Sequence, residues 1–452
     1  MPTIRKWLWK AVLAVSSNTL GDLSRLTRWE RLDSSAAAAL QHQRLTRLVR
    51  HAHAHVPWYR QTLAEAGVVS GKGQIVLEHW TNLPLLTKDM LRSHTDRLTA
   101  RNSDPSAFWN TSGGSTGEPV RILQDKPYRD MVRAVTMLFY RWAGYEFGFP
   151  QVKIWGSERD LFEGAESPFT RLVRWLRNEH WFNAFRMSQA DMLNCLDVID
   201  RIQPVLIVGY VESLLDLARL LLRKERSMHR PAAVMTAAGP LDSDARDLVK
   251  RAFGAPVFDR YGSREVGDVA SECESHAGLH VCMPTHFVEI LRSDGQPSEP
   301  GERGELVITS LTNYSMPLIR YQIGDISAWR DGGCPCGRAW PLIERVVGRV
   351  SDIFVRADGT HVHGEYFTHL FYRLNWVRKF QVIQESLRRI EVHVVPVDKG
   401  DNQDVRTWDL EEVRRKIRLV MGEECVVDFT FRTAIDPMPS GKYRYTISRI
   451  TA

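Results

Sequence analysis

The chain has 452 residues, of which 43% are hydrophobic and 25% are charged, and its formal net charge is +6. This length predicts two or three domains, and the ordinary composition indicates a globular protein with a sizeable core. No block of five or more Lys and Arg occurs, which argues against nucleic-acid binding. Six cysteines are too few for a disulfide scaffold, and no run of 18 apolar residues predicts a membrane span.

The first 34 residues form a separate N-terminal segment. Arg5, Lys6 and Lys10 lie among apolar residues within positions 1–20, which predicts a basic amphipathic helix. Such a helix could contact a membrane surface or pack on the protein body. A signal peptide fits less well because the apolar stretch is broken and no small-residue cleavage site follows it. Helical spacing continues within 35–65, and Pro57 ends that pattern.

A run of glycine and hydroxyl residues follows a short apolar stretch. It consists of Ser112, Gly113, Gly114, Ser115, Thr116 and Gly117. These residues form helices and strands poorly, but their N–H and hydroxyl groups suit a loop that binds a triphosphate. A flexible linker is the alternative, although a strand-like stretch at 120–123 follows at once. The run is not a Walker A loop because no Gly-Lys-Ser/Thr ends it.

Residues 150–260 alternate between strand and helix patterns. Short apolar runs near 152–155, 205–208, 232–236 and 256–258 are separated by helical patterns near 192–202, 214–223 and 243–253. This alternation predicts an α/β domain with a parallel sheet and helices on its faces. Ligands then bind beyond the carboxyl ends of the strands, near Gly239 and the segment 259–262.

The pattern changes to strands and turns over 281–330, which predicts an antiparallel sheet or distorted barrel. Together these patterns predict a large domain at 35–347. A small mobile α+β domain is expected at 348–452, with strands near 352–356, 379–385, 390–396 and 425–431 and helices near 364–374 and 409–420.

Four further motifs follow the glycine-rich run in order: Tyr261-Gly262-Ser263-Arg264-Glu265, Tyr321-Gln322-Ile323-Gly324-Asp325, Gly348-Arg349-Val350-Ser351-Asp352 and Pro439-Ser440-Gly441-Lys442. Each is weak alone, but the ordered set over about 340 residues resembles the adenylate-forming superfamily of acyl-CoA synthetases. The chain is most similar to the phenylacetate–CoA ligase family, including its CapK-like members in capsule biosynthesis. The resemblance covers the chain from about residue 40.

The resemblance implies a two-step reaction. A carboxylic acid reacts with ATP to give acyl-AMP and pyrophosphate, and a thiol, of CoA or of a carrier protein, then displaces AMP. The resemblance further implies that Ser112, Gly114, Ser115, Thr116 and Gly117 cradle the phosphates. Charge developing on phosphate oxygens requires preplaced donors and cations.

The other motif residues receive roles from the same resemblance. Glu265 would hold Mg²⁺, a cation that prefers carboxylate and phosphate oxygens. Tyr261 would flank the adenine, in a slot lined by Gly239, Asp259, Arg260, Gly262 and Ser263. Asp325 would bind the ribose hydroxyls, and Arg349 the ribose or phosphate. Lys442 would be the mobile catalytic cation, on a C-terminal lid.

Three positions depart from the family pattern. Glu118 stands where many relatives have a lysine, Ile323 replaces a threonine, and Ser351 occupies the hinge position. Each residue also has a structural alternative: a turn cap for Asp325, an interface ion pair for Arg349, an exposed carboxylate for Glu265 and a solvated lysine for Lys442.

The cysteines near the middle of the chain suggest a metal site. Cys334 and Cys336 form a C-x-C turn, and Cys273 lies upstream with His280 nearby. Three thiolates and one imidazole match a structural Zn²⁺ site within an insert at 273–338, which some relatives share. His276 is the rival for His280, and free reduced thiols are the alternative. Cys195, Cys282 and Cys425 are expected to be buried without a role in metal binding.

Three functions remain open: an acid–thiol ligase, a ligase with an amine or sugar acceptor, and a non-catalytic nucleotide-binding homologue. The acyl pocket is expected among aromatic residues from several elements, which favours an aryl or medium-length acid. These residues are Phe139, Tyr140, Trp142, Trp155 and Tyr210. A cytoplasmic location and a homodimer are expectations from the family.

Overall fold

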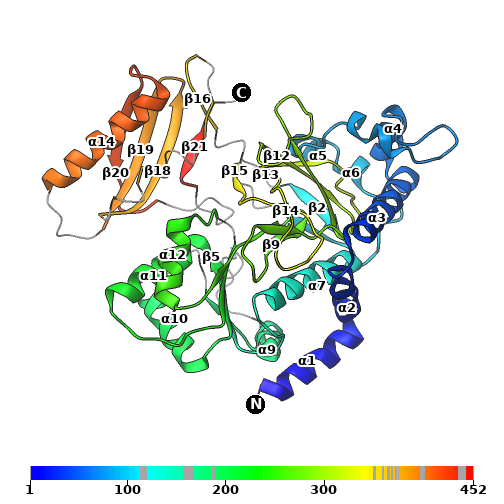
Figure 1. Ribbon diagram of the computed structural model, residues 1–452, viewed down its shortest axis with the longest axis horizontal. Coiled ribbons are helices and arrows are strands. Elements are labelled where there is room, and N and C mark those ends of the chain that lie inside the picture. The colour runs from blue at the N-terminus through cyan, green and yellow to red at the C-terminus, as the bar shows by residue number, and fades with distance from the viewer. Residues whose placement is uncertain are drawn as a thin grey trace. The chain divides into compact units, whose positions relative to one another are not determined.

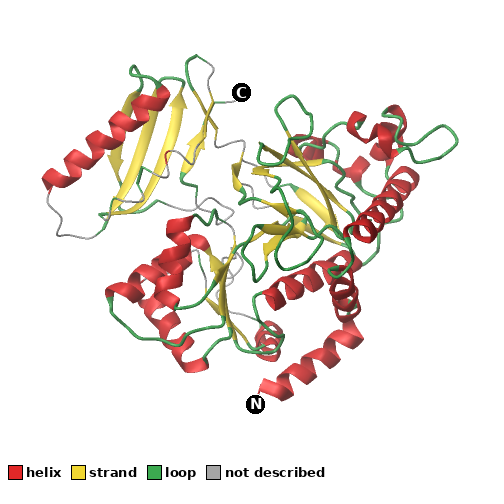
Figure 2. Cartoon of the chain, viewed as in Figure 1, coloured by secondary structure: helices red, strands yellow, loops and turns green. Residues whose placement is uncertain are grey.

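A computed structural model of the chain describes residues 2–111, 120–155, 167–182, 184, 189–237, 239–349, 353–358, 361–363, 367, 370–371, 374, 376–397, 403–435 and 444–450. These residues form two compact units. The first lies within 1–323 and 327–346, and the second within 324–326 and 347–452. The fold is α/β, as expected, with one parallel sheet, several antiparallel sheets and a smaller α+β unit (Figures 1 and 2).

Helices dominate the first 100 residues. Asp33 caps the third helix through its carboxylate, which accepts a hydrogen bond from the backbone N–H of Ala36 at 2.8 Å. That helix ends at His55, and Pro57 begins the next one, where its missing N–H group costs no hydrogen bond. The elements are α1 (Pro2–Ser16), α2 (Thr19–Trp29), α3 (Ser34–His55), α4 (Pro57–Glu65), η1 (Leu77–Asn82), α5 (Lys88–Ser93) and α6 (Thr95–Leu98).

Five parallel strands form one sheet in the order β4-β3-β5-β6-β7. The alternation of strands and helices expected over 150–260 is therefore present, and the structure adds α9 and β4, which the sequence patterns did not predict. The elements are β3 (Gln151–Ile154), α9 (Pro168–Arg177), β4 (Glu179–Phe182), α10 (Gln189–Ile202), β5 (Leu206–Tyr210), α11 (Val211–Arg223), β6 (Ala233–Ala237), α12 (Ser243–Phe253) and β7 (Val257–Phe258).

Both faces of this sheet are covered. Ile207 and Val234 pack in one core cluster with residues of α10, α11 and α12. Their neighbours Val208 and Met235 pack in another cluster with Tyr140 of α7 (Lys126–Trp142). Successive strand residues point to opposite faces, so burial of both faces requires continuous apolar runs rather than alternation.

Antiparallel strands make up the rest of the first unit. A hairpin of β1 and β2 precedes α7, one sheet has the order β14-β10-β9-β8, and another contains β11, β12 and β13. The strands are β1 (Phe108–Thr111), β2 (Arg121–Gln124), β8 (Arg260–Ser263), β9 (Gly267–Glu272), β10 (Leu279–Val281), β11 (His286–Leu291), β12 (Arg303–Ser310), β13 (Tyr321–Ala328) and β14 (Leu342–Ile343).

The second unit contains a four-stranded sheet in the order β20-β19-β18-β21 and a hairpin of β16 and β17. Its expected strands and its second helix are present, whereas most of the helix expected near 364–374 lies outside the described residues. The elements are β15 (Val347–Arg349), β16 (Ile353–Val355), β17 (His361–His363), β18 (Val377–Ser386), β19 (Arg389–Pro396), α14 (Gln403–Met421), β20 (Val426–Phe431) and β21 (Thr446–Ser448).

The N-terminal helix α1 packs on the first unit through one face. Trp9 and Leu13 are 5% and 1% exposed. Lys6 forms an ion pair with Glu146 at 3.6 Å. Packing on the body, one of the two expected placements, therefore occurs. None of the helices described here has the length and apolar content needed to cross a membrane.

Candidate active site and cysteine–histidine cluster

The expected phosphate loop connects two paired strands. Thr111, the last residue of β1, lies opposite Arg121, the first residue of β2, so the two strands pair antiparallel on either side of the expected loop. Ser112, Gly114, Ser115, Thr116, Gly117 and Glu118 themselves lie outside the described residues.

The base of this hairpin is joined to the Tyr261–Glu265 motif. The side-chain amide of Gln124 donates a hydrogen bond to the backbone carbonyl of Arg264 at 2.9 Å, and that of Asn110 reaches the same oxygen at 3.4 Å. Asn110 also donates to the Gln124 side-chain oxygen at 3.1 Å. Two motifs that are 140 residues apart in sequence are therefore neighbours. The sequence patterns missed both amides because no local pattern marks their distant partner.

Glu265 follows β8 in a tight turn and is 6% exposed. Its backbone N–H donates to the Ser263 hydroxyl at 3.2 Å, and the Tyr128 hydroxyl donates to its carbonyl at 3.4 Å. Gly262 allows the strands to approach here, since a Cβ atom at this position would lie 2.5 Å from the Gly267 carbonyl oxygen. The turn therefore holds the Glu265 backbone in a defined position.

Asp259 and Arg260 lie at the carboxyl edge of the parallel sheet and are almost buried. The Thr236 hydroxyl donates to the Asp259 carboxylate at 3.0 Å. Burial, and then the charge of nearby Glu272, raises the pKa of Asp259 to about 6. Arg246 donates two hydrogen bonds to Glu272, at 3.0 and 2.7 Å. The polar side chains at the carboxyl edge of the parallel sheet therefore form one hydrogen-bonded network.

Aromatic rings lie beside this network. The rings of Trp155 and Tyr210, which end two neighbouring strands, are 4.7 Å apart. The Arg260 guanidinium lies 5.6 Å from the centre of the Trp155 ring. It also donates hydrogen bonds to the two carboxylate oxygens of Asp268, at 2.9 and 2.8 Å. Gly239 follows β6 at the same edge and is exposed. These residues can line a slot for a planar group.

Asp325 and Arg349 are directly opposite each other in the second unit. Their Cα atoms are partners across β13 and β15, with a register shift beside Asp325. Gly324, with φ of +84°, supplies the left-handed conformation before Asp325. The Arg349 side chain lies outside the described residues. The register nevertheless brings the backbones of two motifs together, as their proposed common ligand requires.

Lys442 also lies outside the described residues. The chain that follows it is anchored, because the backbone N–H of Val382 donates to the Tyr445 carbonyl at 2.7 Å and Gln381 donates to the Arg444 carbonyl at 2.9 Å. β21 then pairs in parallel with β18.

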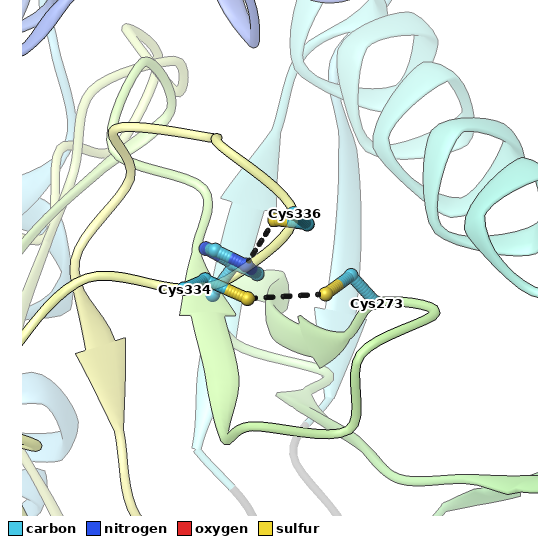
Figure 3. Close-up of side chains that lie close together, drawn as sticks. Cys273, Cys334 and Cys336 are labelled. Carbon is cyan, nitrogen blue, oxygen red and sulfur yellow. Dashed lines mark hydrogen bonds between the residues drawn. The ribbon is translucent and has the colours of Figure 1, made fainter.

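Cys273, His280, Cys334 and Cys336 form a compact cluster. The sulfur atoms of Cys273 and Cys334 face each other at 3.5 Å, and the Cys336 sulfur lies 3.3 Å from Nε2 of His280 (Figure 3). All four ligand atoms lie within 4.8 Å of one another. Tetrahedral Zn²⁺ would place its sulfur ligands about 3.8 Å apart, so the donor set and its spacing fit this metal.

The surroundings orient the four donors. Nδ1 of His280 lies 2.9 Å from the Trp340 carbonyl, so it carries the proton and Nε2 presents its lone pair to the sulfur atoms. The backbone N–H groups of Ser275 and Arg338 donate to the sulfurs of Cys273 and Cys336, at 3.4 and 3.5 Å. Such bonds favour thiolates over thiols.

The rival histidine lies elsewhere. His276 makes a hydrogen bond to Glu272 at 3.1 Å and packs against the ring of Phe258. It is not among the four grouped donors, and neither is Cys282, which is buried in the adjacent core. The geometry therefore selects His280 as the fourth donor.

Known proteins resemble this chain in sequence and fold. The CapK C-terminal domain family matches residues 354–449. Protein CapK of Staphylococcus aureus is 24% identical over 417 residues, covering 91% of this chain and 89% of that protein. A phenylacetate-coenzyme A ligase of Thermus thermophilus is 28% identical over 338 residues, covering 72% and 73%. The solved structure of 2-hydroxyisobutyryl-CoA ligase, 18% identical, has a TM-score of 0.71 and covers 93% and 91%.

The chain is thus similar in sequence to phenylacetate–CoA ligases and to CapK, and similar in fold to 2-hydroxyisobutyryl-CoA ligase.

One departure from the superfamily pattern has a structural explanation. Ile323 is 1% exposed and packs in the main core of the first unit. Its side chain therefore contributes to packing of this core. Glu118 and Ser351 lie outside the described residues.

The aromatic set expected to line the acyl pocket is divided by the structure. Phe139 and Trp142 pack in the core beside the cysteines, where the Trp142 ring lies 5.7 Å from that of His280. Tyr140 instead packs against the parallel sheet near Trp155. The expectation that Phe139 and Trp142 line the acyl pocket was therefore wrong. Successive residues on a helix point about 100° apart, so these two side chains do not share the direction of Tyr140.

Proposed function

We propose that this protein activates a carboxylic acid with ATP and transfers the acyl group to a thiol, most simply that of CoA. The main support is a pair of hydrogen bonds between the strands beside the glycine-rich run and the Tyr261–Glu265 motif. The side-chain amides of Gln124 and Asn110 both donate to the Arg264 carbonyl. The relatives support it: two are phenylacetate-CoA ligase and 2-hydroxyisobutyryl-CoA ligase, the latter solved with an acyl-AMP.

The reaction has two balanced steps. A carboxylate oxygen of the acid attacks the α-phosphorus of ATP, and the bond to pyrophosphate breaks with its electron pair leaving on pyrophosphate. The thiol sulfur then attacks the acyl carbon, the bond to AMP breaks, and the thiol proton passes to solvent. Negative charge increases on the α-phosphate and on pyrophosphate in the first step, so cations and N–H donors accelerate it.

The residues of this chain divide these tasks. Ser112, Gly114, Ser115, Thr116 and Gly117 bind the β- and γ-phosphates through the hairpin connection. Glu265 holds Mg²⁺, which supplies charge neutralisation on the phosphates. Lys442 stabilises charge on the α-phosphate and is released for the second step.

The nucleoside would lie at the carboxyl edge of the sheet. Tyr261 flanks the adenine, and Gly239, Asp259, Arg260, Gly262 and Ser263 line its slot. Asp325 accepts hydrogen bonds from the ribose hydroxyls, and the partner strand carries Arg349 beside it. A buried carboxylate with a raised pKa, such as Asp259, is common at binding sites.

We also propose that Cys273, His280, Cys334 and Cys336 hold a structural Zn²⁺. Four protein donors leave no open position for substrate, so the metal would stabilise the fold and take no part in acyl transfer. The convergence of the four donors supports this assignment, because all their ligand atoms lie within 4.8 Å of one another.

An amine or sugar acceptor is the second candidate. The match of residues 354–449 to the CapK C-terminal domain family, together with the 24% identity to CapK over most of the chain, favours it. The cytoplasmic location and the homodimer stay predictions from the sequence, as does the preference for an aryl or medium-length acid.

The test is ATP–pyrophosphate exchange with a panel of aryl, fatty and amino acids, in the presence of Mg²⁺ and without an acceptor. Acid-dependent exchange is expected, and the ranking of acids defines the pocket. AMP release is then measured with CoA, with amines and with sugars, which separates the two acceptor classes. ATP binding without exchange for any acid would contradict the proposal and favour a non-catalytic nucleotide-binding protein.

A further inference from the structure

The N-terminal helix α1 has two apolar faces. Trp9 and Leu13 form the face that packs on the protein body. The opposite face consists of exposed apolar residues at helical spacing: Ile4 (64%), Trp7 (66%), Leu8 (47%), Val12 (41%) and Val15 (90% exposed). A helix that is apolar on opposite sides is expected between two apolar partners, and the protein itself supplies only one of them.

The neighbouring helix α9 extends this apolar surface. Phe169, Leu172 and Trp175 recur every third residue and are 74%, 52% and 48% exposed, and α9 has no buried residue at all. The Arg5 guanidinium of α1 lies 4.4 Å from the Trp175 ring, and Arg177 of α9 lies 4.8 Å from the Trp9 ring. The two helices are thus side by side at one end of the first unit (Figure 1).

Exposed apolar residues are concentrated here. Of the fifteen large apolar side chains exposed in the described part of the chain, eight belong to α1 and α9. Single exposed apolar residues are ordinary, but a cluster of eight that includes three aromatic and two leucine side chains indicates an interaction site. Tryptophan and phenylalanine are the residues that amphipathic helices insert at a membrane interface.

The charge of this surface indicates which partner it fits. Arg5, Lys6 and Lys10 on α1 and Arg171, Arg174 and Arg177 on α9 are six cations, and neither helix contains Asp or Glu. The whole chain has a net charge of +6, so its remaining residues sum to zero. Glu146 and Glu179 lie 3.6 and 3.9 Å from Lys6 and Arg177 and form ion pairs with these two cations.

A hollow lies beside the apolar surface, and its lining contains three arginines and one carboxylate, that of Glu179. Its volume is about 520 Å³, and Arg5, Arg171, Arg174, Trp175 and Trp181 are among the residues that line it. Guanidinium groups bind phosphate oxygens through paired hydrogen bonds, while the indole rings offer an apolar wall. The combination matches a phospholipid, which presents a phosphate next to apolar chains.

We propose that α1 and α9 form a docking surface for an anionic phospholipid bilayer, with α1 lying in the plane of the interface. The apolar side chains enter the acyl boundary, and the cations contact lipid phosphates. The face of α1 that carries Trp9 stays on the protein body. The proposal is independent of the acceptor used in catalysis.

The experiment is co-sedimentation of the full-length protein with vesicles of phosphatidylglycerol and phosphatidylcholine in equal parts, and with phosphatidylcholine alone. Binding to the anionic vesicles is expected, and salt should weaken it because surface charges are screened. Trp7→Gln with Phe169→Gln should weaken binding about tenfold or more, since each aromatic loses its burial in lipid. Trp408→Gln is the matched control, because Trp408 of α14 is 69% exposed outside the docking surface.

A second pair of variants tests the charges. Lys10→Gln with Arg171→Gln should weaken binding, whereas Arg388→Gln with Arg389→Gln, which removes two cations elsewhere, should leave it unchanged. Unaltered melting temperatures and ATP–pyrophosphate exchange would show that the variants are folded. Absence of binding to anionic vesicles would overturn the proposal, as would equal binding to neutral vesicles. Concentration-dependent dimerisation that the Trp7 and Phe169 variant abolishes, without vesicle binding, would assign the surface to a second copy of the chain.

Discussion

Nε2 of His280 lies 3.3 Å from the sulfur of Cys336, although the two residues are 56 positions apart. The other ring nitrogen, Nδ1, donates a hydrogen bond to the Trp340 carbonyl. The imidazole is therefore already oriented for metal binding. The three sulfur atoms and Nε2 all lie within 4.8 Å of one another, which is the spacing that a single tetrahedral metal ion requires.

The first prediction concerns this metal. We expect one zinc per chain by elemental analysis, and Cys334→Ser should weaken zinc affinity at least about 100-fold because one of four ligands is lost. The melting temperature should fall with it. Cys282→Ala is the control, since Cys282 is buried nearby but outside the donor set. A stable, active protein that contains no metal would contradict the assignment.

The second prediction concerns the catalytic lysine. Lys442→Ala should slow adenylation on the order of 100-fold or more, roughly 3 kcal/mol, which is typical for loss of one preorganised charge-stabilising group. Thioester formation from supplied acyl-AMP should be affected much less, because the second step does not need this cation. Each half-reaction is measured separately. Equal losses in both would exclude a lysine that acts only in the first step.

The third prediction concerns the base of the hairpin. Gln124→Leu removes the shorter of the two hydrogen bonds to the Arg264 carbonyl and leaves that oxygen with only the 3.4 Å bond from Asn110. The expected cost is about 1–2 kcal/mol, which corresponds to roughly 5–30-fold in kcat/KM for ATP. Gln41→Leu is a matched control, because Gln41 also donates its amide to backbone carbonyls, those of Met283 and His286, away from the hairpin. Similar decreases of kcat/KM for ATP in both variants would indicate a general effect on folding.

The fourth prediction concerns the pH dependence of stability. Burial raises the pKa of Asp259 from 3.8 to about 6, so between these values the folded protein holds a proton that the unfolded chain releases. Stability should therefore fall as pH rises through this window, by about 3 kcal/mol for a shift of about two units. Asp259→Asn removes the cost of ionising this buried carboxyl. The free energy of unfolding of the variant should therefore exceed that of the wild type at pH 7.5 but not at pH 4.

The control for this measurement is Asp294→Asn. Asp294 is exposed, and the backbone N–H of Gln296 lowers the pKa of its carboxyl, so its loss should give no gain at pH 7.5. Denaturant unfolding without ATP measures both variants against the wild type. A constant difference between Asp259→Asn and the wild type at every pH would show that the Asp259 carboxyl titrates normally.

Local sequence patterns predicted much of the fold. The helix at 243–253 was predicted with the observed bounds, and the four predicted strands of the parallel sheet lie within one or two residues of those observed. Apolar periodicity and continuous apolar runs are local consequences of which faces are buried. The pair α9 and β4 was missed, because β4 pairs with β3, which lies 28 residues away in sequence, and few local signals mark it.

The sequence by itself determined the α/β class, the order of the motifs and the residue types of the two candidate sites, because these depend on composition and spacing along the chain. Only the tertiary structure decided between His276 and His280, and only it joined Gln124 to Arg264. It also separated Phe139 and Trp142 from Tyr140, and left one face of α1 exposed. These outcomes depend on distances between segments that are remote in sequence and on which side of a helix meets the core, and neither is encoded in a local pattern.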